Sequence, residues 1–135
     1  GACLAKGNAA QLLTPGTHGS TFGGNPLVCR TASTVLEVIN QEKILNNVND
    51  LSDYIGLRFS QQLANVSTVK EIRIKGLMIA IELNQDCSQL LQQALDKKLL
   101  INITGQSIRL LPPLIINKDQ ANIMIETICN LINDL

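Results

Sequence analysis

The sequence of 135 residues predicts an α+β fold, with a small antiparallel sheet covered by helices on one face. Two observations support this prediction. Apolar stripes at helical spacing occupy the region after residue 25 and the C-terminal end, and short β-branched runs separated by glycines lie between them. Because these runs do not alternate regularly with helices, a doubly wound parallel sheet is disfavoured. The length suits one domain with an apolar core.

The first 25 residues are rich in glycine, threonine and small side chains, and the run TPGTHGSTFGGN predicts a loop. A helix is expected to begin at Pro26. Asn25 suits the N-cap position, and proline lacks the amide hydrogen that would be left unpaired there. The expected helix carries one apolar stripe, formed by Val28, Ala32, Val35, Leu36 and Ile39.

A second helical stripe follows the run QEK, and the two stripes are compatible with one bent helix or with two helices. Gly56 lies inside the second stripe and should destabilise it modestly. The stripe consists of Ile44, Val48, Leu51, Ile55, Phe59 and Leu63.

From Val69 the pattern becomes that of strands, because Ile72 and Ile74 alternate with charged residues and Gly76 precedes the nearly continuous apolar run LMIAIEL. A strand or a bulged pair of strands is expected. Residues 88–99 return to helical spacing, and the inward side chains are predicted to be Leu91, Ala94 and Leu95.

The remaining segments predict a hairpin and a final helix. LLINIT and SIRLL flank Gly105 and Gln106, which suit a glycine-first two-residue turn, and two prolines then end the second strand. Asn117 and Gln120 have the spacing of a capping box. The helix that follows carries an apolar face formed by Ala121, Met124, Ile125, Ile128 and Ile132.

Composition argues against several classes of partner. Lysine and arginine total 11, aspartate and glutamate total 11, and aromatic residues make up 2%, so neither a basic face nor a stacking surface for nucleic acid is expected. No apolar run approaches the roughly 18 residues of a membrane helix, and we expect a cytoplasmic protein. The four scattered cysteines predict reduced thiols and no metal site. A start at glycine suggests a fragment of a longer protein.

The segment from His18 to Pro26 places hydroxyls and two glycines before a helix start, which suits an anion such as phosphate. Ser20 and Thr21 can donate hydrogen bonds, and Gly23 and Gly24 permit close approach of the backbone. The alternative is a glycine-rich turn capped by Asn25 that binds no ligand.

Three segments resemble the class III pyridoxal-phosphate aminotransferases, in the order found in that family. They are HGSTFGGNPLVCRTASTVLEVI, GACLAKG near the start, and IRLLPPLII near the end. Within the family, LLINITGQSIRLLPPLII is most similar to the acetylornithine aminotransferase subgroup, followed by the ornithine subgroup. The resemblance implies that residues 1–40 end a large cofactor-binding domain of fold type I, with the phosphate loop and a linking helix. Residues 41–135 would be the small C-terminal domain.

The resemblance also implies roles for individual residues. Thr21 would bind the phosphate of pyridoxal 5'-phosphate across a homodimer interface, with Ser20 beside it. Arg109 would bind a substrate carboxylate, for which a planar guanidinium is suited. Its alternative role is an ion pair with an acid such as Glu82 on a neighbouring strand, and both roles can hold at different stages.

No catalytic residue is expected within this chain, because the lysine that forms a Schiff base with the cofactor would lie upstream of Gly1. Lys6 lies on the wrong side of GACLA for that lysine and is expected to be an exposed charge. For His18 we expect a loop histidine without a catalytic task, and for Cys29 a small core residue.

The implied activity of the full-length protein is transfer of an amino group between N-acetylornithine and 2-oxoglutarate, yielding glutamate, in arginine biosynthesis. Ornithine or succinylornithine are the alternative donors. An alternative of another class is a freestanding, non-enzymatic α+β binding module whose glycine loop is only a helix entry. The chain by itself, without the lysine, is expected to be inactive.

Overall fold

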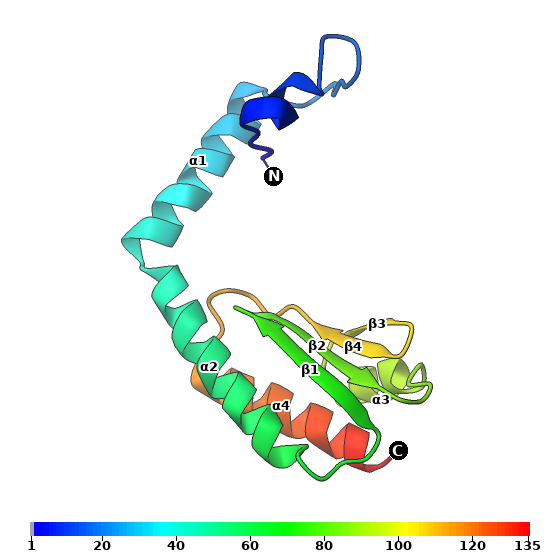
Figure 1. The fold of residues 1–135 in the computed structure, drawn as a ribbon. Coiled ribbons are helices and arrows are strands. Elements are labelled where there is room, and N and C mark those ends of the chain that lie inside the picture. The colour runs from blue at the N-terminus through cyan, green and yellow to red at the C-terminus, as the bar shows by residue number, and fades with distance from the viewer. Residues whose placement is uncertain (1) are drawn as a thin grey trace. The chain divides into compact units, whose positions relative to one another are not determined.

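The computed structural model describes residues 2–135 (Figure 1). It divides into two compact units, Gly1–Lys43 and Ile44–Leu135, which are described separately below. The division falls between two helices, α1 (Pro26–Gln41) and α2 (Ile44–Gln62). The chain turns there through Lys43, which has a positive φ of 51°. The two apolar stripes after residue 25 therefore form two helices rather than one.

Unit 1 contains a short 3₁₀ helix, η1 (Gly7–Gln11), a long loop, and α1. The predicted start of α1 is confirmed. Asn25 is the N-cap residue, and its side-chain oxygen accepts a hydrogen bond of 3.0 Å from the amide of Val28, with Pro26 at the first helical position.

Unit 1 has no apolar core of its own. Between residues 2 and 43 no side chain is buried. The predicted stripe of α1 is present as a pattern, but Leu36 is 63% exposed and Val35 is 52% exposed. A helix with an uncovered apolar face gains little stability from packing, so packing within unit 1 contributes little to the stability of α1.

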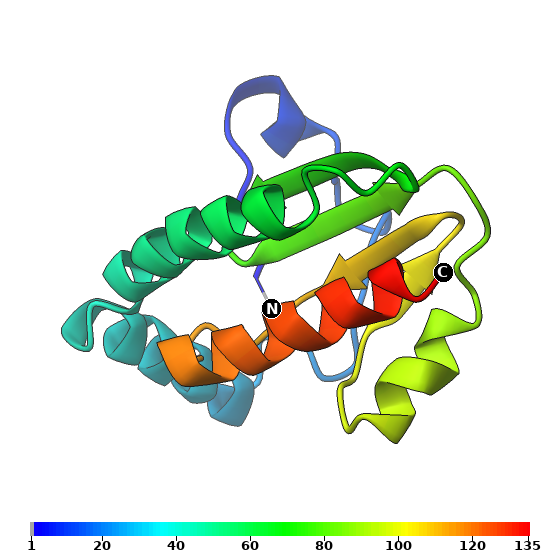
Figure 2. The same cartoon turned by 90° about the horizontal axis from the view of Figure 1, so that it is seen from below.

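Unit 2 confirms the predicted α+β fold. After α2 come β1 (Val69–Lys75), β2 (Met78–Leu83), α3 (Leu90–Asp96), β3 (Asn102–Thr104), β4 (Ser107–Leu110) and α4 (Lys118–Asn133). The four strands form one antiparallel sheet in the order β1-β2-β4-β3. Figures 1 and 2 show α2 and α4 side by side along the sheet.

The core of unit 2 lies between one face of the sheet and the helices. Every residue of the predicted α2 stripe is buried, as is the predicted apolar face of α4. Side chains of the two central strands alternate between the core and the opposite, open face. The core-facing residues of these strands are Ile79, Ile81, Leu83, Ile108 and Leu110.

Two glycine-first turns connect the hairpins. Gly76 has a φ of 56° and links β1 to β2, and Gly105 has a φ of 59° and links β4 to β3. The flanking residues are paired across both turns, which confirms the predicted hairpin at Gly105. The alternation near Val69 is interrupted by an irregularity between Val69 and Glu71, as expected for a bulged pair.

The prediction for the third helix is partly wrong. It spans Leu90–Asp96 rather than residues 88–99, and its buried residues are Leu90 and Ala94. Leu91 and Leu95, predicted to face inward, are 50% and 51% exposed. The buried pair and the exposed pair each consist of residues four positions apart, so periodicity cannot distinguish them. Leu90 and Ala94 are the buried pair because α3 packs against α4 on that side. The helix ends early because Lys98 adopts a φ of 62°.

We predict that Gly56→Ala stabilises unit 2. A Cβ atom at position 56 would lie 3.5 Å from Cδ1 of Ile74, an ordinary van der Waals contact, and alanine is the better helix former. The free energy of unfolding, measured by urea denaturation followed by circular dichroism, should rise by about 0.5 to 1 kcal/mol.

The matched control is Gly76→Ala, which should lower stability. Gly76 has a positive φ of 56°, and its added Cβ would lie only 3.2 Å from Cγ1 of Val48. Equal effects of the two substitutions would show that the backbone conformation at these glycines is not as described.

Candidate functional site

The loop before α1 is shaped by its own side chains. The Ser20 hydroxyl oxygen accepts a hydrogen bond of 2.9 Å from the amide of Gly23. A Cβ atom at position 23 would lie 2.9 Å from the Ser20 Cβ, so only glycine fits this turn. Gly24 has a φ of 74°, and the side-chain amide of Asn25 donates to the backbone carbonyl of Phe22. These contacts hold Ser20 and Thr21 next to the helix start.

The helix start itself offers fewer free amides than expected. The amide of Val28 is bonded to Asn25, that of Cys29 donates to the Asn25 carbonyl at 3.0 Å, and Pro26 has none. The Asn25 side chain satisfies the amide of Val28, and the Asn25 carbonyl satisfies that of Cys29, so neither amide is available to an anion. The hydroxyl groups of Ser20 and Thr21 are the side-chain donors next to this helix start.

The hydroxyls of this loop fit a phosphate group. The Thr21 side chain is exposed and has no hydrogen-bond partner within residues 2–135, and the Ser20 hydroxyl accepts one bond while its own proton remains available. Residues 1–36 contain Lys6 and Arg30 but no aspartate or glutamate. A dianion would therefore meet no repelling carboxylate from this segment.

Arg109 lies in unit 2, on the open face of the sheet. The strand register places it opposite Ala80 of β2, which is in turn opposite Arg73 of β1. Arg73, Ala80 and Arg109 thus lie side by side on three adjacent strands, with the small side chain of Ala80 between the two arginines. Arg109 is half-buried in this row, whereas the residue after it in the chain, Leu110, faces the core.

Glu82, the predicted alternative partner of Arg109, is occupied by other cations. Its carboxylate accepts hydrogen bonds from Lys70 at 2.5 Å and from Arg73 at 2.6 Å, and Arg73 also pairs with Glu71. These bonds from Lys70 and Arg73 hold the pKa of Glu82 below its ordinary value. The register sets Glu82 opposite Ser107, so the proposed Glu82–Arg109 pair is not formed.

Arg109 consequently has no acidic partner among residues 2–135. It borders a shallow hollow of about 230 Å³ on the open face. Sequence reasoning missed two residues here, Lys75 and Ala80. The strand pattern placed Arg73 and Lys75 on one face, but only the strand pairing brings them beside Arg109. The hollow is lined by Arg73, Ile74, Lys75, Met78, Ile79, Ala80, Arg109 and Leu111.

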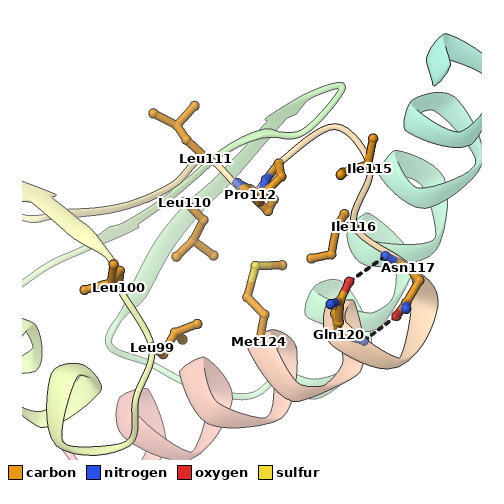
Figure 3. A pocket seen from close by; sticks show the side chains of 11 residues that line it. Leu99, Leu100, Leu110, Leu111, Pro112, Ile115, Ile116, Asn117, Gln120 and Met124 are labelled. Carbon is orange, nitrogen blue, oxygen red and sulfur yellow. Dashed lines mark hydrogen bonds between the residues drawn. The ribbon is translucent and has the colours of Figure 1, made fainter. Parts of the chain in front are cut away.

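A second, larger hollow of about 700 Å³ lies in unit 2 (Figure 3). Figure 3 shows Leu110, Ile116 and Met124 around this space. Asn117 and Gln120 lie at its edge, where their side chains and amides bond reciprocally and confirm the predicted capping box. No ionisable side chain lines this hollow, so it offers apolar contact but no acid, base or nucleophile.

The other candidate residues line neither hollow. Lys6 and His18 are exposed in unit 1, and Cys29, expected to be a core residue, is exposed as well. Cys87 and Cys129 are buried, and burial raises the pKa of Cys129 to about 11, so this thiol stays protonated and unreactive near neutral pH.

Two kinds of feature, a metal-binding cluster and a membrane-spanning helix, are absent from the described residues. Between residues 2 and 135, His, Cys, Asp and Glu side chains nowhere gather in a group of three or more that could hold a metal ion. In the same stretch, no helix combines the length and the apolar character that crossing a membrane requires.

The chain is similar to known proteins in sequence and in structure. The chain is 42% identical over 133 residues to the acetylornithine aminotransferase of Nitrosomonas europaea, an alignment that covers 98% of this chain and 34% of the relative. The chain therefore spans about a third of the length of the curated relatives that it matches.

Solved structures give the same result. The crystal structure of acetylornithine aminotransferase from Elizabethkingia anophelis matches with a TM-score of 0.81 and 33% identity, covering 98% of this chain and 36% of that one. A Toxoplasma gondii ornithine aminotransferase, described with partial occupancy of PLP at its active site, matches with a TM-score of 0.75 and 32% identity, covering 92% of this chain and 31% of that one. The family model for aminotransferase class III matches residues 1–132. The chain therefore belongs to the class III aminotransferase family.

Proposed function

We propose that the full-length protein is a pyridoxal-phosphate-dependent transaminase that moves an amino group between N-acetylornithine and 2-oxoglutarate, as a step of arginine biosynthesis. The observation that carries this proposal is the Arg109 guanidinium, which lies half-buried on the open face of the sheet without an acidic partner among residues 2–135. A cation held in this way is available to a carboxylate from outside the chain.

The loop before α1 would bind the cofactor phosphate. Thr21 would donate its hydroxyl proton to a phosphate oxygen, and Ser20 would do the same while still accepting the amide of Gly23. When bound, pyridoxal phosphate supplies the electron sink for the reaction, and the protein positions and orients the groups around it. The Toxoplasma gondii relative that is described with PLP supports the assignment.

Arg109 would bind and orient the carboxylate of the amino acceptor. The guanidinium is planar and remains charged, and it can donate two parallel hydrogen bonds to one carboxylate. Because Glu82 is engaged by Lys70 and Arg73, it does not compete for Arg109. Among residues 2–135, no carboxylate therefore competes with the substrate for Arg109.

The choice of amino donor rests on the relatives. The acetylornithine aminotransferase of Nitrosomonas europaea is 42% identical to this chain over 98% of its length, which favours N-acetylornithine. Ornithine is the second candidate, because an ornithine aminotransferase of Staphylococcus saprophyticus is also 42% identical, over 94% of the chain. Succinylornithine is a third candidate. A freestanding, non-enzymatic binding module is disfavoured, because the family model extends over nearly the whole chain.

We predict that Arg109→Ala in the full-length protein raises the Michaelis constant for 2-oxoglutarate much more than it weakens cofactor binding. Loss of a charge-assisted bidentate contact removes about 1.5 to 3 kcal/mol, or roughly 10- to 150-fold in affinity. Steady-state kinetics with each substrate varied separately would measure it. Unchanged kinetics with a lower melting temperature would make Arg109 a structural residue instead.

We predict that the active protein is a homodimer in which Thr21 of one subunit contacts the phosphate held by the other. A Thr21→Val subunit and a subunit that lacks the cofactor-binding lysine should each be inactive alone. In a mixed dimer, one site would carry both defects and the other site neither, so mixing should restore part of the activity. If mixed dimers form without recovery, the cross-subunit contact is wrong.

We predict that the 135-residue chain alone forms no glutamate from N-acetylornithine and 2-oxoglutarate when pyridoxal phosphate is added. The reason is that we expect the lysine needed for nucleophilic catalysis to lie outside this chain. A coupled glutamate assay measures the outcome, and Lys6→Ala is the control. Turnover by the chain that disappears in Lys6→Ala would show that Lys6 is the catalytic lysine.

A further inference from the structure

We propose that Lys75 is a second cationic contact for the dicarboxylate substrate, and that the small side chain of Ala80 keeps the space between Lys75 and Arg109 open. This inference rests on the proposed function and adds to it a residue that decides the specificity for the amino acceptor. The ligand class is a dicarboxylate with an apolar spacer between its two charges.

The strand register places the cationic residues of the hollow on one face of the sheet. Arg73 and Lys75 are two residues apart in β1 and therefore project from the same face of the sheet. Arg73 is opposite Ala80, and Ala80 is opposite Arg109, so this is also the face on which Arg109 lies. All four residues line the same hollow of about 230 Å³. Ala80 occupies the middle of the row with a single methyl group.

The three cationic residues of the hollow differ in whether an acid compensates their charge. Arg73 is bonded to both Glu71 and Glu82, so its charge is largely compensated. Lys75 and Arg109 form no ion pair within residues 2–135, and the lining of the hollow contains no acid. The hollow therefore presents two uncompensated positive charges from different strands, an arrangement complementary to two negative charges.

The lining of the hollow also contains exposed apolar side chains. Met78 and Leu111 also line it, and their side chains are 60% and 59% exposed. The methylene groups of a dicarboxylate would cover these apolar side chains while its ends reach Lys75 and Arg109. A compact anion such as phosphate could contact the cations but would leave Met78 and Leu111 uncovered. The lining therefore favours a dicarboxylate.

Direct binding to the 135-residue chain tests this proposal without any need for turnover. Glutarate is the probe, and butyrate and inorganic phosphate are the comparison ligands, each titrated while amide shifts are followed by NMR at constant ionic strength. We expect saturable shifts at Lys75, Ala80 and Arg109 with glutarate and weaker binding of butyrate and phosphate. Lys75→Met should weaken glutarate binding about 5- to 20-fold, and Lys75→Arg should retain most of it.

Lys97→Met is the control, because it removes the same charge from unit 2 at an exposed residue that forms no ion pair within residues 2–135 and does not line the hollow. It should leave glutarate binding unchanged. Equal losses in Lys97→Met and Lys75→Met would reduce the effect to general electrostatics and overturn the proposal. Absence of saturable glutarate binding, or stronger binding of phosphate than of glutarate, would overturn it as well.

A second pair of variants tests the role of Ala80. In Ala80→Glu, the new carboxylate lies opposite Arg109 and should compete with glutarate, whereas Ala80→Gln has a similar size without the charge. We expect binding to be lost in the first variant and only reduced in the second. Equal binding in both would show that position 80 does not border the site.

Kinetics of the full-length protein separate this inference from the proposed function. Lys75→Met should raise the Michaelis constant for 2-oxoglutarate and leave that for N-acetylornithine and kcat nearly unchanged. If Arg109→Ala raises the constant but Lys75→Met does not, the proposed transaminase stands and Lys75 has no part in it. If the full-length protein shows no transamination, the proposed function fails, and glutarate binding by the chain is still measurable.

Discussion

One-sided burial of the sheet in unit 2 is the constraint on which the rest of this unit depends. The core-facing residues of β2 and β4, among them Ile81 and Ile108, are completely covered by the helices. Since side chains alternate along a strand, the same register puts Ala80 and Arg109 on the open face. A shift of one residue would exchange the two sets and bury a guanidinium. The apolar core therefore determines where the positive charges lie.

The ionic contacts on the open face follow from that register and from one irregularity. The bulge between Val69 and Glu71 changes the pairing at the start of β1, and both Lys70 and Arg73 reach Glu82. Exposed ion pairs of this kind contribute little to stability. Their importance here is that they occupy Glu82, which lies on the strand next to that of Arg109, so that the two residues form no ion pair.

Unit 1 is organised in a different way. Its loop is held by local contacts, such as the bond from Gly23 to Ser20, while the apolar residues of α1 remain exposed. Local bonds suffice to shape this turn, because they involve residues close in sequence. They cannot cover an apolar stripe. The unit thus combines a loop of defined geometry with a helix whose apolar face is not covered within the unit.

The sequence alone determined the features that depend on neighbouring residues: the start of α1 at Asn25 and Pro26, the capping box of Asn117 and Gln120, and the turn at Gly105. Capping and turn formation involve residues within a few positions of one another, so they can be recognised in the sequence. Only the tertiary structure decided which stripe of α3 is buried, which cations take Glu82, and that Lys75 shares a hollow with Arg109. These outcomes depend on packing and register between strands far apart in sequence, where several pairings satisfy the same local pattern.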